Sequence, residues 1–409
     1  MEINHENLKF NFNRIVEITS TDIGCTRLSY SKEDFKVRKI LTEEMNLLGM
    51  EISVDFVGNI RGKYNPDNLE SKSILIGSHI DTVKYGGKYE GLTGVLCSIE
   101  VIRFIKDNNI KINNPIEIVI FSEEEGSNFG VTMIGSKFIT KKIDENYLKN
   151  LYTDDGLSAY EIISSCNFLS DKTNQFFIEG KNEYCMIELH VEQGEILDKE
   201  NKEIGIVKAI AGMKTLQITV EGTSNHAGTT PMAIRRDPVV ASAKIIDKIS
   251  DITKILKMET AVTTVGKILV SPNCSNVIAS KVIFNVDIRD VVEENIKLIA
   301  EYVKKLAFEI ATLQNVEISI DELGKSSVVH MADHIVDTIE KSTKDLELSY
   351  IKMNSGAVHD NAMLNGIIDT GMIFVPSING ISHSPYEDTN FNDIISGANV
   401  LLKSIISLA

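Results

Sequence analysis

The organisation of the whole chain depends on one stretch, residues 73–82, which reads SILIGSHIDT. Its first half is a short run rich in Ile and Leu that starts from polar residues, which is typical of a buried central strand. His79 and Asp81 follow where this strand ends, and open α/β sheets place their ligand sites beyond the carboxyl ends of their strands. Two positions apart on an extended backbone, both side chains point the same way. An imidazole beside a carboxylate suggests a zinc-type site. The alternative is a solvated loop with an incidental histidine.

Composition excludes several classes of protein. The 409 residues are 43% hydrophobic and 24% charged, which favours a soluble globular chain of two domains. A net charge of −16 argues against a nucleic-acid partner and gives no reason to expect an anionic membrane. No apolar run approaches the roughly 20 residues that span a bilayer, and the polar start MEINHE is unlike a signal peptide. Five scattered cysteines without a CxxC pair fit a reducing cytoplasm, where we expect the protein to reside.

Two kinds of periodicity divide the chain. Residues 92–105 repeat apolar side chains at helical spacing and residues 116–121 form another buried run, so strand–helix–strand alternation predicts a largely parallel sheet. Farther along, apolar and polar residues alternate as in strands with one wet face, and the elements follow in the order βαββαβ of a ferredoxin-like unit. We therefore expect a mixed α/β fold with one domain from residues 1–210 and 327–409 and an inserted ferredoxin-like α+β domain from residues 211–326.

Candidate metal ligands recur wherever a strand of the first domain meets a loop. They are His79 with Asp81, Glu90, Glu124 with Glu125, His190 and His383. Each alone is weak evidence, because a lone histidine is more often structural and a run of glutamates is usually a solvated face. Together they match the nitrogen and oxygen ligands of zinc, manganese or cobalt, and no cysteine flanks them. Of two adjacent glutamates, one can bind metal while the other takes a proton from water.

A series of longer motifs carries a resemblance to a known family. In order along the chain they are GSHIDT (77–82), EEGS (124–127), ELHVEQG (188–194), NHAGTTPM (225–232), DIR (287–289), FVPS (374–377) and GISH (380–383). On these motifs the chain resembles the metal-dependent aminoacylase/carboxypeptidase superfamily. Within that superfamily it is most similar to the branch of N-carbamoyl-L-amino acid hydrolases and allantoate amidohydrolases.

The resemblance implies a dinuclear metal site in the first domain, which would be the catalytic domain. His79 and His190 would bind one divalent ion, and Glu125 and His383 would bind the other. Glu90 would bridge the two ions, which would be zinc, or manganese, cobalt or nickel.

The resemblance also implies roles for residues that bind no metal. Asp81 would orient His79, and Glu124 would be the general base that acts on water. His226 would stabilise the oxyanion across a dimer interface, with the inserted domain acting as a lid and as the contact of a homodimer. The substrate would be held by Gln193, Asn276, Arg289, Gly356 and Ala357.

Without the resemblance, two of these residues have simpler interpretations. His226 would be a turn residue before a Thr-Thr-Pro turn, and Arg289 would be a surface charge at a strand end. With it, the planar fork of Arg289 suits the carboxylate of a small acid.

Three positions depart from the pattern of the family. Glu90 stands where the family normally has Asp, so either the loop has adjusted to the longer side chain or the second metal is weakly held. Asn128 stands in place of the usual Arg and Ala279 in place of the usual Pro. These differences concern metal occupancy and substrate choice rather than the fold.

The expected reaction is hydrolysis of a linear C–N amide bond in a small ureido or carbamoyl acid. An N-carbamoyl-L-amino acid would give the L-amino acid, carbon dioxide and ammonia. Allantoate is the alternative substrate, because residues 377–383 resemble the allantoate enzymes. Two further alternatives are a peptidase or aminoacylase of the same superfamily, which the segment at 190–194 disfavours, and a non-catalytic dimer that binds small acids.

Overall fold

Two compact units make up the protein, of which the computed structural model describes residues 2–153, 155–168 and 175–409. The first unit joins Met1–Lys208 with His330–Ala409, and the second is Ala209–Val329. None of the described helices combines the length and the apolar composition that a membrane span requires.

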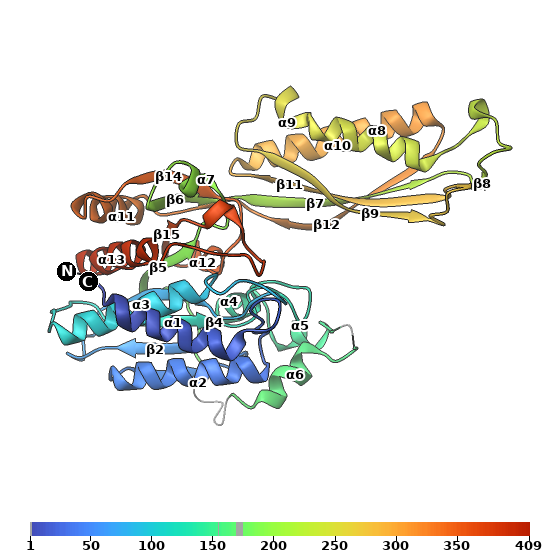
Figure 1. The fold of residues 1–409 in the computed structure, drawn as a ribbon. Helices are drawn as coiled ribbons and strands as arrows, with labels where there is room; N and C mark the ends of the chain where they lie inside the picture. Colours follow the sequence, from blue (N-terminus) through green and yellow to red (C-terminus); the bar gives the residue numbers. More distant parts are fainter. Residues whose placement is uncertain (1, 154, 169–174) are drawn as a thin grey trace. The chain divides into compact units, whose positions relative to one another are not determined.

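A mixed sheet forms the centre of the first unit, in the order β1-β2-β4-β3-β5-β15-β6-β13, with β14 paired to β6 (Figure 1). Its central pairs β4/β3, β3/β5 and β5/β15 are parallel, whereas β1/β2, β2/β4 and β15/β6 are antiparallel. This confirms the predicted mixed α/β class with a largely parallel sheet. The strands are β1 Glu51–Val54, β2 Ile60–Tyr64, β3 Ser73–His79, β4 Ile116–Phe121, β5 Glu183–Val191, β6 Ile204–Ile210, β13 Val329–His330, β14 Tyr350–Ser355 and β15 Asp369–Val375.

Helices cover both faces of this sheet, so neither face of its central strands is exposed to solvent. Every residue of β3 and β4 is buried, which is why their sequences are continuous apolar runs. Helices α3 (Leu92–Asp107) and α13 (Phe391–Leu408) pack together on one face (Figure 1). On the other face, Ile139 of α4 and Leu364 of α12 share a core cluster with Leu75 of β3. The remaining bounds are α1 His5–Thr19, α2 Lys32–Leu47, α4 Ile134–Ile139, α5 Glu145–Lys149, α6 Ala159–Cys166, α7 Ile196–Lys199, α11 Asp333–Asp345 and α12 Asn361–Leu364.

The second unit is an antiparallel sheet with two helices on one face (Figure 1). The strand order is β12-β7-β11-β9, and the chain passes through β7, α8, β9, β11, α10 and β12 in the order βαββαβ. Buried and half-buried residues alternate along β11, because only one face packs against α8 and α10. The bounds are β7 Gly212–Glu221, β8 Asn225–His226, α8 Pro238–Ser250, α9 Ile252–Ile255, β9 Val262–Ser271, β10 Val277–Ile278, β11 Lys281–Asp290, α10 Glu293–Gln314 and β12 Glu317–Ser326.

Candidate metal centre

The candidate ligands of the first unit lie at the carboxyl edge of its parallel strands. His79 is the last residue of β3, and His190 lies next to the end of β5. Glu124 and Glu125 follow β4, and Glu90 directly precedes Gly91, the N-cap residue of α3. Because these parallel strands end at one edge of the sheet, their loops bring the side chains to one place.

Among the described residues, three groups of side chains could each hold a metal ion, and Glu90 belongs to two of them. In the first group, Glu90 Oε1 lies 3.3 Å from His79 Nε2 and 3.2 Å from His190 Nε2. In the second group, Glu90 is joined by Glu125 and His383, and His383 Nε2 lies 3.2 Å from Glu125 Oε2. A carboxylate shared in this way can bridge two cations.

Contacts on the far side of each ring determine which histidine nitrogen faces Glu90. His79 Nδ1 lies 3.1 Å from the carbonyl oxygen of Asp81, and His190 Nδ1 lies 2.8 Å from that of Val191. A ring that donates its Nδ1–H to a carbonyl keeps its lone pair on Nε2. Both Nε2 atoms and Glu90 Oε2 are buried without a hydrogen-bond partner. Since buried polar atoms are rarely left unpaired, these three atoms indicate a further partner.

The buried carboxylates of the site favour a bound positive charge. Burial and the neighbouring Glu90 carboxylate raise the pKa of Glu125 to about 11. Burial also raises the pKa of Glu124 well above its usual range. Burial by itself lowers the pKa of His79, but the surrounding carboxylates of Glu90, Asp81 and Glu124 together outweigh it and raise that pKa well above its usual range. Either protons or a metal ion can supply the missing positive charge.

The donor atoms and their spacing fit a divalent cation. Zinc binds imidazole nitrogen and carboxylate oxygen at about 2.0–2.2 Å, which places tetrahedral ligand atoms roughly 3.3–3.6 Å apart. The three measured nitrogen–oxygen separations of 3.3, 3.2 and 3.2 Å are close to this spacing. Manganese and cobalt also accept such nitrogen and oxygen ligands. Among the described residues, no cysteine belongs to a group that could hold a metal ion.

Asp81 holds the turn that carries the adjacent glutamates. Its Oδ1 accepts the backbone N–H of Glu124 at 3.2 Å, and its Oδ2 accepts that of Glu125 at 3.1 Å. Oδ1 also lies 3.6 Å from His79 Nδ1, so Asp81 connects the histidine with the glutamate turn. On the other side of the ring, a Cβ at Gly91 (φ +65°) would lie 2.4 Å from His79 Cε1. Only glycine can therefore occupy position 91 without moving the histidine.

Glu124 and Gln193 lie beside the ligand groups without belonging to either. Glu124 is 8% exposed, and its Oε2 lies 4.0 Å from His79 Nε2. Gln193 Nε2 lies 3.3 Å from Glu90 Oε1 and 3.4 Å from His383 Nε2, and its Oε1 is buried without a hydrogen-bond partner. These positions suit a proton acceptor and a polar contact for a substrate.

Gly356 and Ala357 form a turn directly after β14. Ser355 Oγ donates to the carbonyl oxygen of Ala357 at 2.8 Å and accepts its N–H at 3.2 Å. A Cβ added to Gly356 would meet nothing within 4 Å, so this side of the turn faces open space. His359 Nε2 lies 3.1 Å from the same Ser355 hydroxyl, and its ring packs edge-on against His190 with centroids 4.6 Å apart. His359 therefore connects the turn to a candidate ligand.

His226, Asn276 and Arg289 lie in the second unit. His226 is exposed in β8, which pairs with β10, and the N–H of Ala227 donates to the carbonyl oxygen of Asn276 at 3.0 Å. Arg289 lies on β11, where its Nε donates to Asp287 Oδ1 at 2.8 Å beside a cavity of about 410 Å³. The fold of this unit thus brings His226 close to Asn276, while Arg289 stands on a different strand. Their roles in binding a substrate remain predictions.

Sequence reasoning assigned no role to several buried residues near the candidate ligands, among them Glu188, His359, Asp360 and Glu387. Glu188 accepts hydrogen bonds from Ser78 Oγ at 2.8 Å and from the N–H of Asn361 at 3.2 Å. With His190 and His359 it forms a third group that could hold a metal ion. The available signal for Glu188 was its place two residues before His190, on the same face of the strand. No sequence signal separated Glu387 from the polar residues around it.

The sheet and the histidine–carboxylate groups at its carboxyl edge define an α/β protein with donor sets that could hold divalent cations. The sequence pattern of Peptidase family M20/M25/M40 matches residues 75–407. The chain is 35% identical to the N-carbamoyl-L-amino-acid amidohydrolase of Pseudomonas sp. (strain NS671), over 99% of the chain and 98% of that protein. It is 34% identical to the allantoate amidohydrolase of Escherichia coli (strain K12), over 94% of the chain and 93% of that protein.

A solved structure agrees with these sequence relatives. The crystal structure of an amidase of the hydantoinase/carbamoylase family from Burkholderia multivorans has a TM-score of 0.93 and 29% identity, and the match covers 99% of this chain and 98% of that one. The chain therefore belongs to peptidase family M20/M25/M40. It is a hydrolase of the amidohydrolase type, and the family predicted from its motifs is confirmed.

Proposed function

We propose that the protein hydrolyses a linear C–N amide bond in a small ureido or carbamoyl acid, with an N-carbamoyl-L-amino acid as substrate. The observation that carries the proposal is that Glu90 is shared by two ligand groups, while Glu124 belongs to neither and lies beside them with its Oε2 4.0 Å from His79 Nε2. Attack of one water molecule breaks one C–N bond of the ureido group and leaves a carbamic acid, which breaks its other C–N bond without further water. The products are the L-amino acid, carbon dioxide and ammonia. The similarity to an N-carbamoyl-L-amino-acid amidohydrolase over nearly the whole chain supports this substrate class.

Two divalent cations per chain complete the proposed site. His79 and His190 would hold one, Glu125 and His383 the other, and Glu90 both, because these residues make up the two groups. When bound, such cations polarise a carbonyl group and lower the pKa of water. The buried, unpartnered Nε2 atoms of His79 and His190 support this assignment.

The protein's own residues move the protons. Glu124 takes a proton from the attacking water as the new C–O bond forms, and returns it to the leaving nitrogen as the C–N bond breaks. Its burial and its 4.0 Å distance from His79 Nε2 place its carboxylate beside the ligands, where a water could be activated. Gln193 would hold the ureido group of the substrate.

The second unit would contribute the remaining substrate contacts. The planar guanidinium of Arg289 would donate two parallel hydrogen bonds to the substrate carboxylate. Its Nε donates to Asp287 Oδ1, which orients the guanidinium. Asn276 would contact the ureido group, and His226 of a second copy would stabilise the oxyanion. Gly356 and Ala357 of the first unit would offer backbone groups to the substrate.

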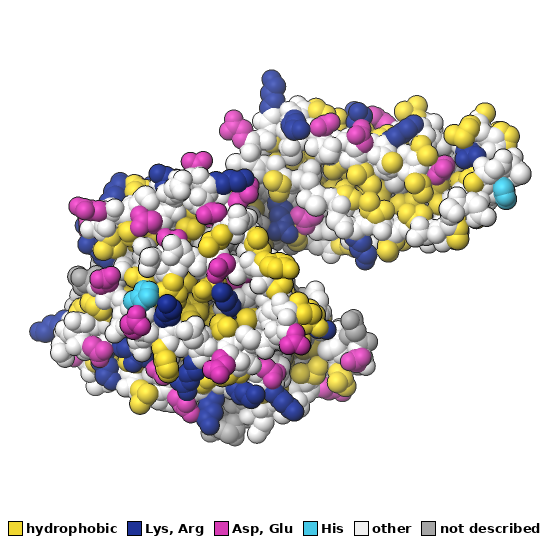
Figure 2. Space-filling view, in the orientation of Figure 1, with side chains coloured by type: hydrophobic (Ala, Val, Ile, Leu, Met, Phe, Trp, Pro, Cys, Tyr) yellow, Lys and Arg dark blue, Asp and Glu magenta, His cyan; other side chains and the backbone are white. Residues whose placement is uncertain are grey.

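We also propose that the protein acts as a cytoplasmic homodimer through its second unit. Among the described residues, β9 pairs only with β11, so one edge of β9 remains open. Val262, Ile268 and Leu269 are exposed on this strand, and Figure 2 shows hydrophobic side chains gathered over this part of the unit. Unprotected apolar edge strands tend to pair with another chain. Sedimentation at low micromolar concentration tests the dimer, and a monomer there would contradict it.

Allantoate is the second candidate substrate. Residues 377–383 resemble the allantoate enzymes, and the chain is 34% identical to one of them. This substrate would release ammonia and carbon dioxide and leave a ureido acid, with the same catalytic residues.

The test is ammonia release from N-carbamoyl-L-amino acids, allantoate and a dipeptide, with the protein loaded separately with zinc, manganese or cobalt. Release from a carbamoyl amino acid supports the first substrate class, and release from allantoate alone supports the second. Hydrolysis of the dipeptide alone, followed as free amino acid, would move the protein to the peptidase branch. If no substrate is hydrolysed with any of the metals, the non-catalytic binding protein is favoured. A stoichiometric metal analysis would then decide whether a dinuclear site exists.

A further inference from the structure

Glu387 joins two loops that carry candidate ligands. It follows His383 in the loop after β15, and its Oε1 accepts the backbone N–H of Tyr89 at 2.9 Å and of Glu90 at 3.0 Å. Its Oε2 lies 3.4 Å from Ser382 Oγ, and the residue is only 4% exposed. Glu90 and Glu387 are 297 positions apart in sequence, so only tertiary contacts hold them together.

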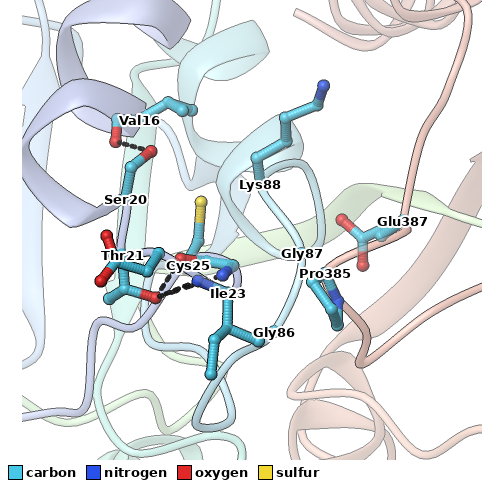
Figure 3. Close-up of a pocket in the computed structure, with 12 residues that line it drawn as sticks. Val16, Ser20, Thr21, Ile23, Cys25, Gly86, Gly87, Lys88, Pro385 and Glu387 are labelled. Atoms are coloured by element: carbon cyan, nitrogen blue, oxygen red, sulfur yellow. Dashed lines mark hydrogen bonds between the residues drawn. The ribbon is translucent and has the colours of Figure 1, made fainter.

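The backbone of the glycine loop is shaped to receive this carboxylate. A Cβ at Gly87 would lie 2.0 Å from Glu387 Cδ and 2.2 Å from its Oε1, so the carboxylate packs directly over the glycine. Figure 3 shows Glu387 and Pro385 facing Gly86, Gly87 and Lys88 across this contact. The exposed pair of Lys88 Nζ and Asp388 Oδ1, 3.4 Å apart, is a second and weaker link between the same loops.

We propose that Glu387 is a positioning residue that couples the two metal positions. The inference rests on the proposed dinuclear site. It adds that, through Glu387, the binding of a metal ion at one position affects the binding of an ion at the other. Glu90 is the ligand common to both groups, and Glu387 fixes its backbone from within the loop that supplies His383. Two consecutive N–H groups bound to one oxygen fix the orientation of the peptide plane before Glu90, and with it the direction in which the side chain leaves the loop.

The surroundings of Glu387 allow its removal without collapse of the loop. A cavity of about 230 Å³ is lined by Glu387 together with residues of the loop at 20–25 and of the glycine loop. In Glu387→Ala, this cavity can extend to the amides of Tyr89 and Glu90, and water can take the place of the lost acceptor. The amides then stay hydrogen-bonded but are no longer tied to the loop of His383. The loss is therefore expected in the metal site rather than in the fold.

Three variants separate this role from a general structural one. Glu387→Gln keeps an oxygen acceptor and should restore the wild-type behaviour. Gly87→Ala leaves the carboxylate in the chain but pushes it away from the loop, so it should act like Glu387→Ala and provides the test if that variant does not fold. Asp388→Asn breaks only the adjacent surface pair and serves as the matched control.

The experiment is a titration of the metal-stripped protein with manganese, followed by electron paramagnetic resonance for exchange coupling between two ions and by calorimetry for affinity. The wild type, Glu387→Gln and Asp388→Asn should bind two coupled ions. Glu387→Ala and Gly87→Ala should lose the coupled signal and bind the second ion about 10–100-fold more weakly. Coupled spectra and unchanged affinities in both variants would overturn the role of Glu387. Fewer than two ions in the wild type would instead overturn the proposed dinuclear site, and this inference with it.

Discussion

Asp81→Asn tests whether one side chain connects the first histidine with the glutamate turn. The carboxylate accepts two buried backbone hydrogen bonds, from Glu124 at 3.2 Å and from Glu125 at 3.1 Å. Asparagine retains one acceptor and turns an NH₂ group toward the other amide, so one of the two bonds is lost. A hydrogen bond to a buried charged group contributes about 1.5–3 kcal/mol. The free energy of unfolding should fall by that amount, and by about twice as much in Asp81→Ala.

The same substitution should weaken metal binding, because Glu125 is a candidate ligand on the turn. Losing a partner that orients metal ligands typically reduces affinity about 10–100-fold. Urea denaturation in the presence of a chelator measures the stability term alone, and competition with a chromogenic chelator measures the affinity. Asp290→Asn is the matched control, since Asp290 is 1% exposed, accepts the N–H groups of Val291 and Val292, and lies in the second unit. It should lose stability and keep its metal affinity.

Two results would refute this reasoning. If Asp81→Asn loses stability but binds metal as tightly as the wild type, the turn does not depend on Asp81 for its ligand geometry. If Asp290→Asn loses metal affinity to the same extent, the effect follows from general destabilisation and not from the link between Asp81 and Glu125.

Three further predictions address the site as a whole. Glu124→Gln should lower turnover about 10²–10⁴-fold with an unchanged metal content by elemental analysis, since it removes a proton acceptor and no ligand; loss of metal would instead make Glu124 a ligand. Chelation should lower the melting temperature and re-addition of metal should restore it, because a cation at 100 times its Kd stabilises the folded state by about 2.7 kcal/mol per site; an unchanged melting temperature would count against the site. Arg289→Ala should raise KM for a carbamoyl amino acid roughly 10–150-fold, the equivalent of one charged hydrogen bond of about 1.5–3 kcal/mol, and equal kinetics would remove Arg289 from the substrate site.

The sequence predicted those parts of the structure that depend on local pattern. The continuous apolar run of β3 and the two polar residues that follow it, His79 and Asp81, identified the central strand and the edge of the sheet where the candidate ligands lie. The alternation of Leu216, Ile218 and Val220 with polar residues along β7 identified a strand with one buried face. In each case neighbouring residues alone report whether one or both faces of the strand are covered.

Contacts between distant segments could not be predicted in this way. Glu387 is one acidic residue in a polar loop, and its contribution to the site comes from its hydrogen bonds to the amides of Tyr89 and Glu90, which are distant in the sequence. His359 likewise matters because its ring lies against His190 and its Nε2 reaches Ser355. The expected role of Asp81 was incomplete for the same reason, because its bonds to the glutamate turn depend on the pairing of β3 with β4.

The longer side chain at position 90 is the departure that the structure helps to explain. Glu90 Oε1 lies 3.3 Å from His79 Nε2 and 3.2 Å from His190 Nε2. The backbone N–H of Glu90 donates to Glu387, which fixes the position of the main chain. The absence of a Cβ at Gly91 lets the His79 ring lie directly against the chain at that point. Backbone position and ring position are thus both set by neighbours, and the extra methylene of Glu spans the distance that remains. In Glu90→Asp, the shorter carboxylate should therefore fall short of one histidine unless the loop moves. Adding Glu387→Ala to this variant releases the loop and should restore part of the metal affinity that Glu90→Asp loses, as measured by competition with a chromogenic chelator.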